Sequence, residues 1–218
     1  MEYLVEDIVR DVKVCLDENV DSTALALLGD ADTLTLDDII ESKIADAARL
    51  VESGAAHHLL DRGEPFGDNI WWQQAPGYGM GMIQLPDDFL RLVTYRMSDW
   101  AMPVTEAITE EDPRYAMQSS RYGGVRGNPW RPVVAIVQHP TGLMLEFYTC
   151  QAGAGVVINA ARYIPMPRIS GGKIKVCEKL YRAIIYRTAS LTALALKDGD
   201  AAAAMLATSN NLADITTE

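Results

Sequence analysis

Cysteine is scarce in this sequence: Cys15, Cys150 and Cys177 are the only three in 218 residues. Because they are widely spaced, they form neither a disulfide framework nor a zinc-binding pattern. We expect them to be buried, unreactive thiols in partly apolar surroundings. Histidine is equally rare, and the adjacent His57 and His58 would diverge by about 100° on a helix, so they cannot chelate one metal together. The sequence therefore predicts no metal site.

Long apolar runs are also missing. No run approaches the roughly 20 residues that span a bilayer, and the acidic start MEYLVEDIVRDVKV lacks the basic-then-apolar layout of a secretory signal. We therefore expect a soluble protein that is made in a cytoplasm and has no membrane partner. The glycines of Gly77–Gly81 lead into an extended segment rather than a helix N-terminus, so no helix dipole is available to hold a phosphate. No cofactor is predicted.

Catalytic patterns are weak. The best enzymatic arrangement is a Cys–His nucleophile pair, Cys150 with His139, across a predicted hairpin. A reactive thiolate needs a stabilising partner and an oxyanion hole, and the sequence shows neither. The acidic groups Asp87-Asp88 and Glu110-Glu111-Asp112 adjoin prolines, which is typical of turns and caps. We expect no enzyme, and a small thiol-dependent hydrolase is the weaker alternative.

Charge, in contrast, is abundant and unevenly laid out. The segment Met1–Glu64 contains 16 Asp/Glu against 5 Lys/Arg, and it accounts for the whole formal net charge of −11. Arg121 to Arg187 contains ten basic residues and two acids. An acidic and a basic surface on one molecule favour head-to-tail association of identical copies. The basic stretch could instead contact phosphate. A further alternative is an acidic protein-binding module, of the DNA-mimic type, that occupies a basic partner.

The hydrophobic pattern predicts helices at both ends of the chain and strands between them. Apolar residues recur at helical spacing from Leu4 to Leu16. They recur again after a capping box formed by Thr35 and Asp38, in a helix that ends near residue 58 or 60. Extended segments are predicted over 82–85, 89–97, 132–138, 143–150 and 156–164. Further helices are predicted over 110–117 and 176–196, and a last one begins near Asp198 or Asp200 and covers 201–206.

This order of elements predicts an α+β fold: a helical bundle from the N- and C-terminal helices, with an inserted small antiparallel β-sheet. The expected divisions are acidic N-terminal helices over 1–64, a β-rich insertion with loops over 65–168, and C-terminal helices that complete the bundle over 169–218. Residues 75–81 and 121–130 are predicted to be loops because they are rich in glycine.

Large aromatic side chains and arginines gather in these predicted loops. Trp, Tyr and Arg dominate binding hot spots, so we predict an interface there; the alternative is that the rings pack the sheet onto the bundle. Lys179 and Arg182 are three residues apart and share one face of the predicted long helix, where they add a basic contact. The candidate interface residues are Trp71, Trp72, Tyr78, Arg121, Tyr122, Arg126, Trp130, Lys179 and Arg182.

One segment resembles a known family. Ile83-Gln-Leu-Pro-Asp-Asp-Phe-Leu-Arg-Leu-Val93, running into Tyr95-Arg-Met-Ser-Asp-Trp100, is similar to head-to-tail connector proteins of tailed phages, as is the helix–sheet–helix order. These adaptor or ring proteins stack beneath the portal. The resemblance implies a virion protein that forms a homo-oligomeric ring of about twelve copies. Its partners would be the portal and neighbouring tail or ring proteins.

The same resemblance implies an axial channel through which DNA passes, and it supplies no catalytic residue. An acidic bundle that lined such a channel would let DNA slide without sequence-specific binding, because like charges repel and no counterion release rewards contact.

Overall fold

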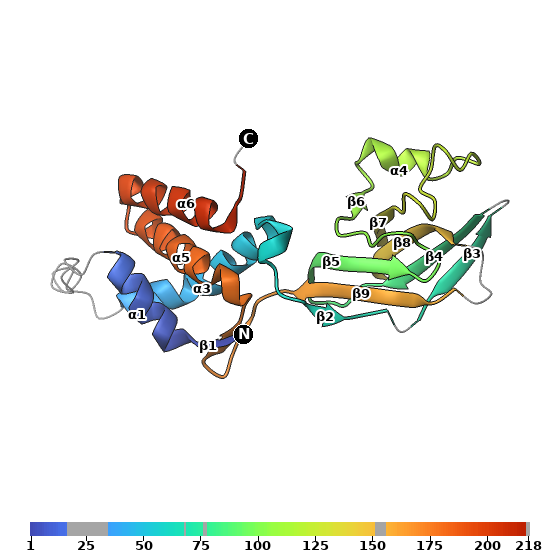
Figure 1. Ribbon diagram of the computed structural model, residues 1–218. Helices are drawn as coiled ribbons and strands as arrows, with labels where there is room; N and C mark the ends of the chain where they lie inside the picture. Colours follow the sequence, from blue (N-terminus) through green and yellow to red (C-terminus); the bar gives the residue numbers. More distant parts are fainter. Residues whose placement is uncertain (17–34, 68, 76–77, 151–155, 217–218) are drawn as a thin grey trace. The chain divides into compact units, whose positions relative to one another are not determined.

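The computed structural model describes residues 1–16, 35–67, 69–75, 78–150 and 156–216. The chain forms two compact units: unit 1 is Met1–Asp61 with Met166–Glu218, and unit 2 is Arg62–Pro165. Helices dominate unit 1 and strands dominate unit 2 (Figure 1). Because the chain returns to unit 1 at Met166, unit 2 is an insertion in the sequence of unit 1.

The described residues of unit 1 contain four α-helices: α1 (Val5–Cys15), α3 (Leu36–Gly54), α5 (Tyr181–Ala195) and α6 (Gly199–Ala213). Helix α5 contacts each of the others. The predicted capping box of α3 is confirmed, since the Asp38 N–H donates to the Thr35 hydroxyl and the Thr35 N–H donates to the Asp38 carboxylate. The helix ends earlier than predicted, at Gly54.

Helices α5 and α6 run side by side (Figure 1). The Ser190 hydroxyl donates to the Ala202 carbonyl at 2.7 Å, and the Ser209 hydroxyl donates to the Ala183 carbonyl at 2.8 Å. Small side chains at these positions allow the backbones to approach closely enough for both bonds. Helix α6 begins after its N-cap Asp198, as predicted, and extends to Ala213, beyond the predicted coverage to Leu206.

Unit 1 also contains a small sheet that the sequence pattern did not predict. Its strands are β1 (Glu2–Leu4), β10 (Ile169–Ser170) and β11 (Lys173–Lys175), in the order β1-β11-β10. Each strand is too short for an alternating pattern to stand out. The predicted long helix consequently begins later, at Tyr181, after the 3₁₀ turn η2 (Glu178–Leu180).

A buried polar cluster joins the two sequence halves of unit 1. The Cys177 N–H donates to Glu52 Oε1 at 2.6 Å, and the Asp61 N–H donates to Cys177 Sγ at 3.4 Å. Glu52 is 1% exposed and Cys177 is 3% exposed. Burial raises the pKa of the Cys177 thiol to about 12 and raises the pKa of Glu52 above its ordinary value. The prediction that this cysteine is buried is confirmed at Cys177.

We expect Glu52→Gln to remove the loss of stability that ionisation of the buried Glu52 causes in the native protein as pH rises. Because its folded-state pKa is raised, the folded protein holds the Glu52 proton more tightly than the unfolded chain does. This tighter binding of the proton stabilises the folded protein fully at pH values below the pKa of Glu52 in the unfolded chain. The stabilisation is lost as pH rises through the pKa of Glu52 in the folded protein. Glutamine keeps an acceptor for the Cys177 N–H without titrating. The melting temperature of Glu52→Gln relative to the native chain should therefore increase from about pH 4 to about pH 8.

The control for this experiment is Glu41→Gln, which changes an exposed glutamate of the same helix. A difference in melting temperature between Glu52→Gln and the native chain that stayed constant across this pH range would contradict the expectation.

Unit 2 is a sandwich of two sheets. One has the order β2-β9-β5 and the other has the order β3-β4-β8-β7-β6; only the β6–β7 pair among the described strands is parallel. The strands of the first sheet are β2 (Glu64–Pro65), β9 (Ile158–Pro165) and β5 (Phe89–Met97). The strands of the second are β3 (Trp71–Ala75), β4 (Tyr78–Gln84), β8 (Gly142–Cys150), β7 (Val134–His139) and β6 (Ile108–Thr109).

The two sheets share one hydrophobic core. The side chains of Leu92, Tyr95 and Met97 from β5 pack with Leu145 and Phe147 from β8. The other face of the larger sheet carries a second cluster that includes Ala135, Val137 and Tyr148, against which Tyr115 of helix α4 (Pro113–Met117) packs. The larger sheet is therefore covered on both faces, which explains its continuous Val/Ile-rich strands.

Glycine has a packing role in strand β4. Gly81 lies opposite Trp72 of β3 and opposite Phe147 of β8, and the two rings meet edge to face with centroids 5.5 Å apart. A Cβ atom on Gly81 would lie 2.0 Å from Phe147 Cζ. Because glycine has no side chain, Gly81 leaves room for the Phe147 ring, which occupies the position that a Cβ atom would need.

The predicted helical bundle with a small inserted sheet is wrong. The described residues form a mixed α/β structure with five α-helices and eleven strands in three sheets. The residues around Gly79 and Gly81, predicted to be a loop, belong to the β3–β4 hairpin, although residues 76–77 lie outside the described part. Several other predictions are confirmed: the opening helix, strand β5, the β7–β8 hairpin and strand β9.

Candidate interaction surface

An exposed apolar and basic surface lies on unit 2, where the chain runs from α4 to β7. The backbone N–H of Ala101 donates to the Pro129 carbonyl at 2.8 Å, which brings the neighbouring Met102 to the same region. We define the loop surface as the exposed side chains of Met102, Met117, Arg121, Tyr122, Val125, Trp130 and Arg131. Exposed apolar side chains with arginines beside them in the sequence make this surface a candidate interaction site.

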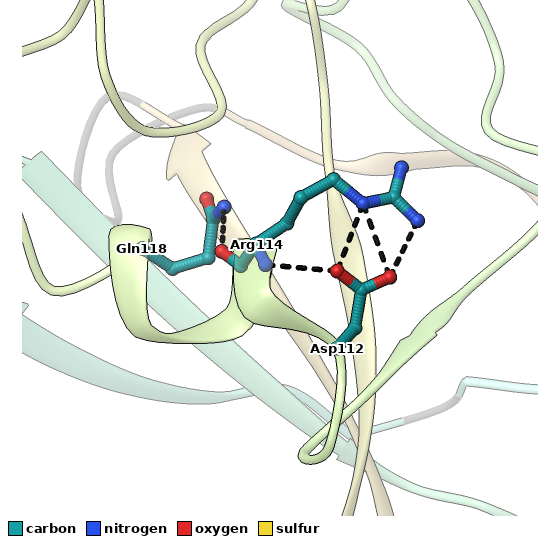
Figure 2. A network of polar contacts seen from close by, with 3 residues as sticks. All are labelled: Asp112, Arg114 and Gln118. Atoms are coloured by element: carbon teal, nitrogen blue, oxygen red, sulfur yellow. Dashed lines mark hydrogen bonds and ion pairs between the residues drawn. The ribbon is translucent and has the colours of Figure 1, made fainter.

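Helix α4 anchors the start of this loop. The Asp112 carboxylate caps the helix, because it accepts a hydrogen bond from the backbone N–H of Arg114 at 2.8 Å. It also accepts a hydrogen bond from the Arg114 guanidinium at 2.6 Å (Figure 2). These bonds hold the pKa of Asp112 below its usual range. At the other end, Gln118 Nε2 donates to the Arg114 carbonyl at 2.8 Å (Figure 2).

Gln118 also connects the helix to the far end of the loop. Its side chain is buried, and its Oε1 accepts the Gly127 N–H at 2.8 Å. Helix α4 is in turn attached to the sheet, because the Tyr115 hydroxyl donates to Glu146 Oε2 on β8 at 3.2 Å. The same oxygen accepts a hydrogen bond from the Tyr148 hydroxyl, also on β8, at 2.5 Å. Burial and this carboxylate raise the pKa of Tyr148. The loop surface is therefore fixed to the rigid sheet through buried polar contacts.

A tight turn presents Trp130. The backbones of Asn128 and Arg131 exchange two hydrogen bonds, at 3.1 and 2.9 Å, and Asn128 Oδ1 accepts the N–H groups of Trp130 and Arg131. Pro129 and Trp130 occupy the corner positions, where proline restricts the backbone. Trp130 is 77% exposed, the highest value among the large hydrophobic side chains described. The turn fixes the backbone that carries this ring.

Arg121 and Tyr122 form a second exposed group. The Arg121 guanidinium donates to the Tyr122 hydroxyl at 2.8 Å and lies 5.0 Å from the centroid of its ring. Among the residues that the structure describes, neither Arg121 nor Arg131 forms an ion pair. Both cations are therefore available for carboxylates of a partner.

The other candidate interface residues of unit 2 lie elsewhere. Arg126 is buried beneath the loop surface rather than exposed on it. Trp72 is half-buried and its ring meets Phe147 edge to face. Trp71 is 48% exposed on β3, and Tyr78 is the first residue of β4. The structure thus exposes Arg121, Tyr122 and Trp130 on one loop and buries Arg126 of the same loop. It places Trp71, Trp72 and Tyr78 on strands β3 and β4.

Lys179 and Arg182 lie in unit 1, but not on one continuous α-helix. Lys179 is in the 3₁₀ turn η2, where its Nζ donates to the His58 carbonyl at 3.0 Å, and Arg182 is in the first turn of α5. Both side chains are exposed. The basic run from Arg121 to Arg187 is consequently divided between the two units.

Sequence reasoning missed a cavity of about 210 Å³ between α1 and α5. It is lined by Asp11, Val14, Cys15, Tyr181, Arg182, Ile185 and Tyr186. Cys15 is half-buried there, not fully buried as predicted. The pairs Asp11/Cys15, Tyr181/Ile185 and Arg182/Tyr186 are each four residues apart. This spacing is the signal that could have placed them on facing helix surfaces.

The Cys150–His139 pair does not assemble. His139 pairs with Gly142 at one end of β8, and Cys150 pairs with Gly79 at the other. The length of β8 from Gly142 to Cys150 separates the two, about 27 Å at about 3.4 Å per residue. Among the described residues, no group of three or more His, Cys, Asp or Glu side chains could hold a metal ion. No described helix has the length and apolar content to cross a membrane.

No protein-family model matches the chain, and a search of the curated proteins finds none with significant similarity.

Proposed function

We propose that this chain is a structural protein of a phage virion, which assembles into a closed ring at the portal and leaves an axial channel for DNA. The observation that carries the proposal is the loop surface. Its exposed Trp130, Tyr122 and Arg121 are the residue types that dominate protein–protein hot spots, and a rigid scaffold positions them. A scaffold that presents such a surface suits assembly.

The partner in this proposal is another copy of the chain, together with the portal. The segment Ile83–Val93 that resembles phage connector proteins includes parts of β4 and β5, within the sandwich that supports the loop surface. The acidic segment Met1–Glu64 and a basic, aromatic loop on the same chain favour a heterologous contact, which closes into a ring when the rotation per copy allows. The exposed cations Arg121 and Arg131 are unfavourable for a protein that mimics DNA, because its surface should be acidic throughout.

Native mass spectrometry of the purified chain, alone and mixed with the portal protein of the same phage, tests this function. We expect one closed species of about twelve copies in at least one of the two samples. Connector proteins can require the portal as a template, so a monomer in the first sample alone is compatible with the proposal. A chain that stays monomeric and does not bind the portal would contradict it.

A further inference from the structure

The α1–α5 cavity has the size of a side-chain pocket. Its volume of about 210 Å³ is below the roughly 300–1,000 Å³ typical of small-molecule sites. It exceeds the roughly 150 Å³ of an apolar protein cavity that holds benzene. The space therefore accommodates one large ring from a partner rather than a cofactor.

The lining of this cavity favours an aromatic ring that carries a hydrogen-bond donor. Val14, Ile185 and the rings of Tyr181 and Tyr186 supply apolar walls. Asp11 Oδ2 accepts a hydrogen bond from the Tyr181 hydroxyl at 2.7 Å, and Asp11 Oδ1 lies 3.8 Å from Arg10 Nε. An ionised carboxylate with these two contacts still has lone pairs for a further N–H group.

Arg182 adds a cation that can lie over a ring face. Among aromatic side chains, tryptophan offers the best face for such a contact, and its indole N–H is a donor. The chemistry of the cavity thus selects tryptophan over phenylalanine, which has no donor.

Unit 2 presents a tryptophan in a suitable form. Trp130 is 77% exposed at the corner of a hydrogen-bonded turn, whereas Trp100 is buried and Trp72 packs on Phe147. A fixed turn lowers the entropy cost of inserting the ring. The cavity carries one charge of each sign, Asp11 on α1 and Arg182 on α5, so Asp11 is the group that can attract Arg131, the residue that follows Trp130.

We infer that the α1–α5 cavity is a socket for Trp130 of a second copy of this chain. The inference rests on the proposed function and names the contact between neighbouring copies. Indole insertion places the ring between Tyr181 and Tyr186, with its N–H toward Asp11 and its face toward Arg182. The candidate interface residues Trp130 and Arg182, predicted separately from the sequence, then belong to opposite sides of one contact.

Cys15 reports on occupancy because it lines the socket. The native chain is treated with iodoacetamide at a series of protein concentrations, with and without the portal, and peptide mass mapping separates the three cysteines. In dilute monomer we expect Cys15 to react faster than buried Cys177. In the assembled ring we expect the Cys15 rate to fall at least about tenfold.

Two variants make the result specific to Trp130. Trp130→Ala is expected to weaken assembly and to keep Cys15 reactive, whereas Val157→Ala, at an exposed apolar residue of unit 2 outside the loop surface, changes neither. Direct contact is tested with a photoreactive benzoylphenylalanine at position 130, which keeps a large ring there. It should cross-link to α1 or α5 of another copy.

The opposing results are distinct. A ring in which Cys15 reacts as fast as in the monomer, or in which position 130 cross-links elsewhere, overturns the socket and leaves the ring intact. Protection of Cys15 that is already complete in dilute monomer means that one chain fills its own cavity, and it also overturns the inference. A chain that never associates, alone or with the portal, overturns both the socket and the proposed function.

Discussion

Replacing Gly81 with alanine is expected to lower the unfolding free energy of unit 2 by about 3 kcal/mol. The added Cβ would lie 2.0 Å from Cζ of Phe147 and 2.4 Å from its Cε2. Phe147 cannot move aside cheaply, because it is fully buried in the core shared by the two sheets and contacts the rings of Trp72, Tyr95 and Trp100. Chemical denaturation followed by tryptophan fluorescence measures this loss.

The matched control is Gly123→Ala on the loop, where the added Cβ meets no atom within 4 Å. Its stability should equal that of the native chain. A second change, Phe147→Leu in the Gly81→Ala background, should recover part of the loss because the smaller side chain vacates the contested space. Native stability in Gly81→Ala would show that the Phe147 ring does not pack across this glycine.

Charge reversal at two positions of unit 1 is expected to weaken self-association by about 100-fold, which corresponds to about 2.7 kcal/mol. In Lys179→Glu/Arg182→Glu, new carboxylates replace two exposed cations, one of which lines the socket beside Asp11. Folding should change little, because Lys179 loses a single exposed hydrogen bond to the His58 carbonyl. Sedimentation velocity measures association, and thermal unfolding measures stability.

The control is a double variant of α3 that changes the net charge by the same amount at a different place in unit 1. Lys43→Glu/Arg49→Glu reverses two cations of α3, one of which forms only an exposed ion pair with Asp46. If both double variants weaken association equally, net charge rather than a basic contact at Lys179 and Arg182 controls assembly, and this account of the interface fails.

Local signals in the sequence predicted much of the secondary structure. The Thr35–Asp38 capping box located the start of α3, since the motif satisfies backbone donors close to the helix N-terminus. The turn at His139–Gly142 located the β7–β8 hairpin, and the alternation from Phe89 to Met97 located β5. Each of these features is decided by residues close together in the chain.

Features decided by distant residues were missed. Strand β1 forms because Glu2–Leu4 pairs with Lys173–Lys175, which lies far along the chain, and neither segment carries a strand pattern of its own. Strand β4 contains Gly79 and Gly81, which indicate a loop until Phe147 is known to lie opposite. Missing β4 made the inserted sheet too small in the prediction, and missing the β1-β11-β10 sheet made unit 1 too helical.

The candidate site was also predicted only in part: its local features were predicted, and its features that depend on distant residues were not. Composition placed Arg121, Tyr122 and Trp130 in one exposed loop, because aromatic residues, arginine and glycine were concentrated there. Their role as an interface stays a prediction. The burial of Arg126 depends on how Gln118 and Gly127 fold the loop back on itself, which no local pattern reveals. The α1–α5 cavity requires two helices far apart in sequence to face each other.

The most direct measurement of the central claim is cryo-electron microscopy of this chain bound to its portal. The account predicts a closed ring coaxial with the portal, with an open axial channel. It also predicts that the Met117–Arg131 loop of each copy contacts the next copy. Single copies scattered on the portal, or a ring whose subunits meet through other surfaces while Trp130 remains in solvent, would contradict it.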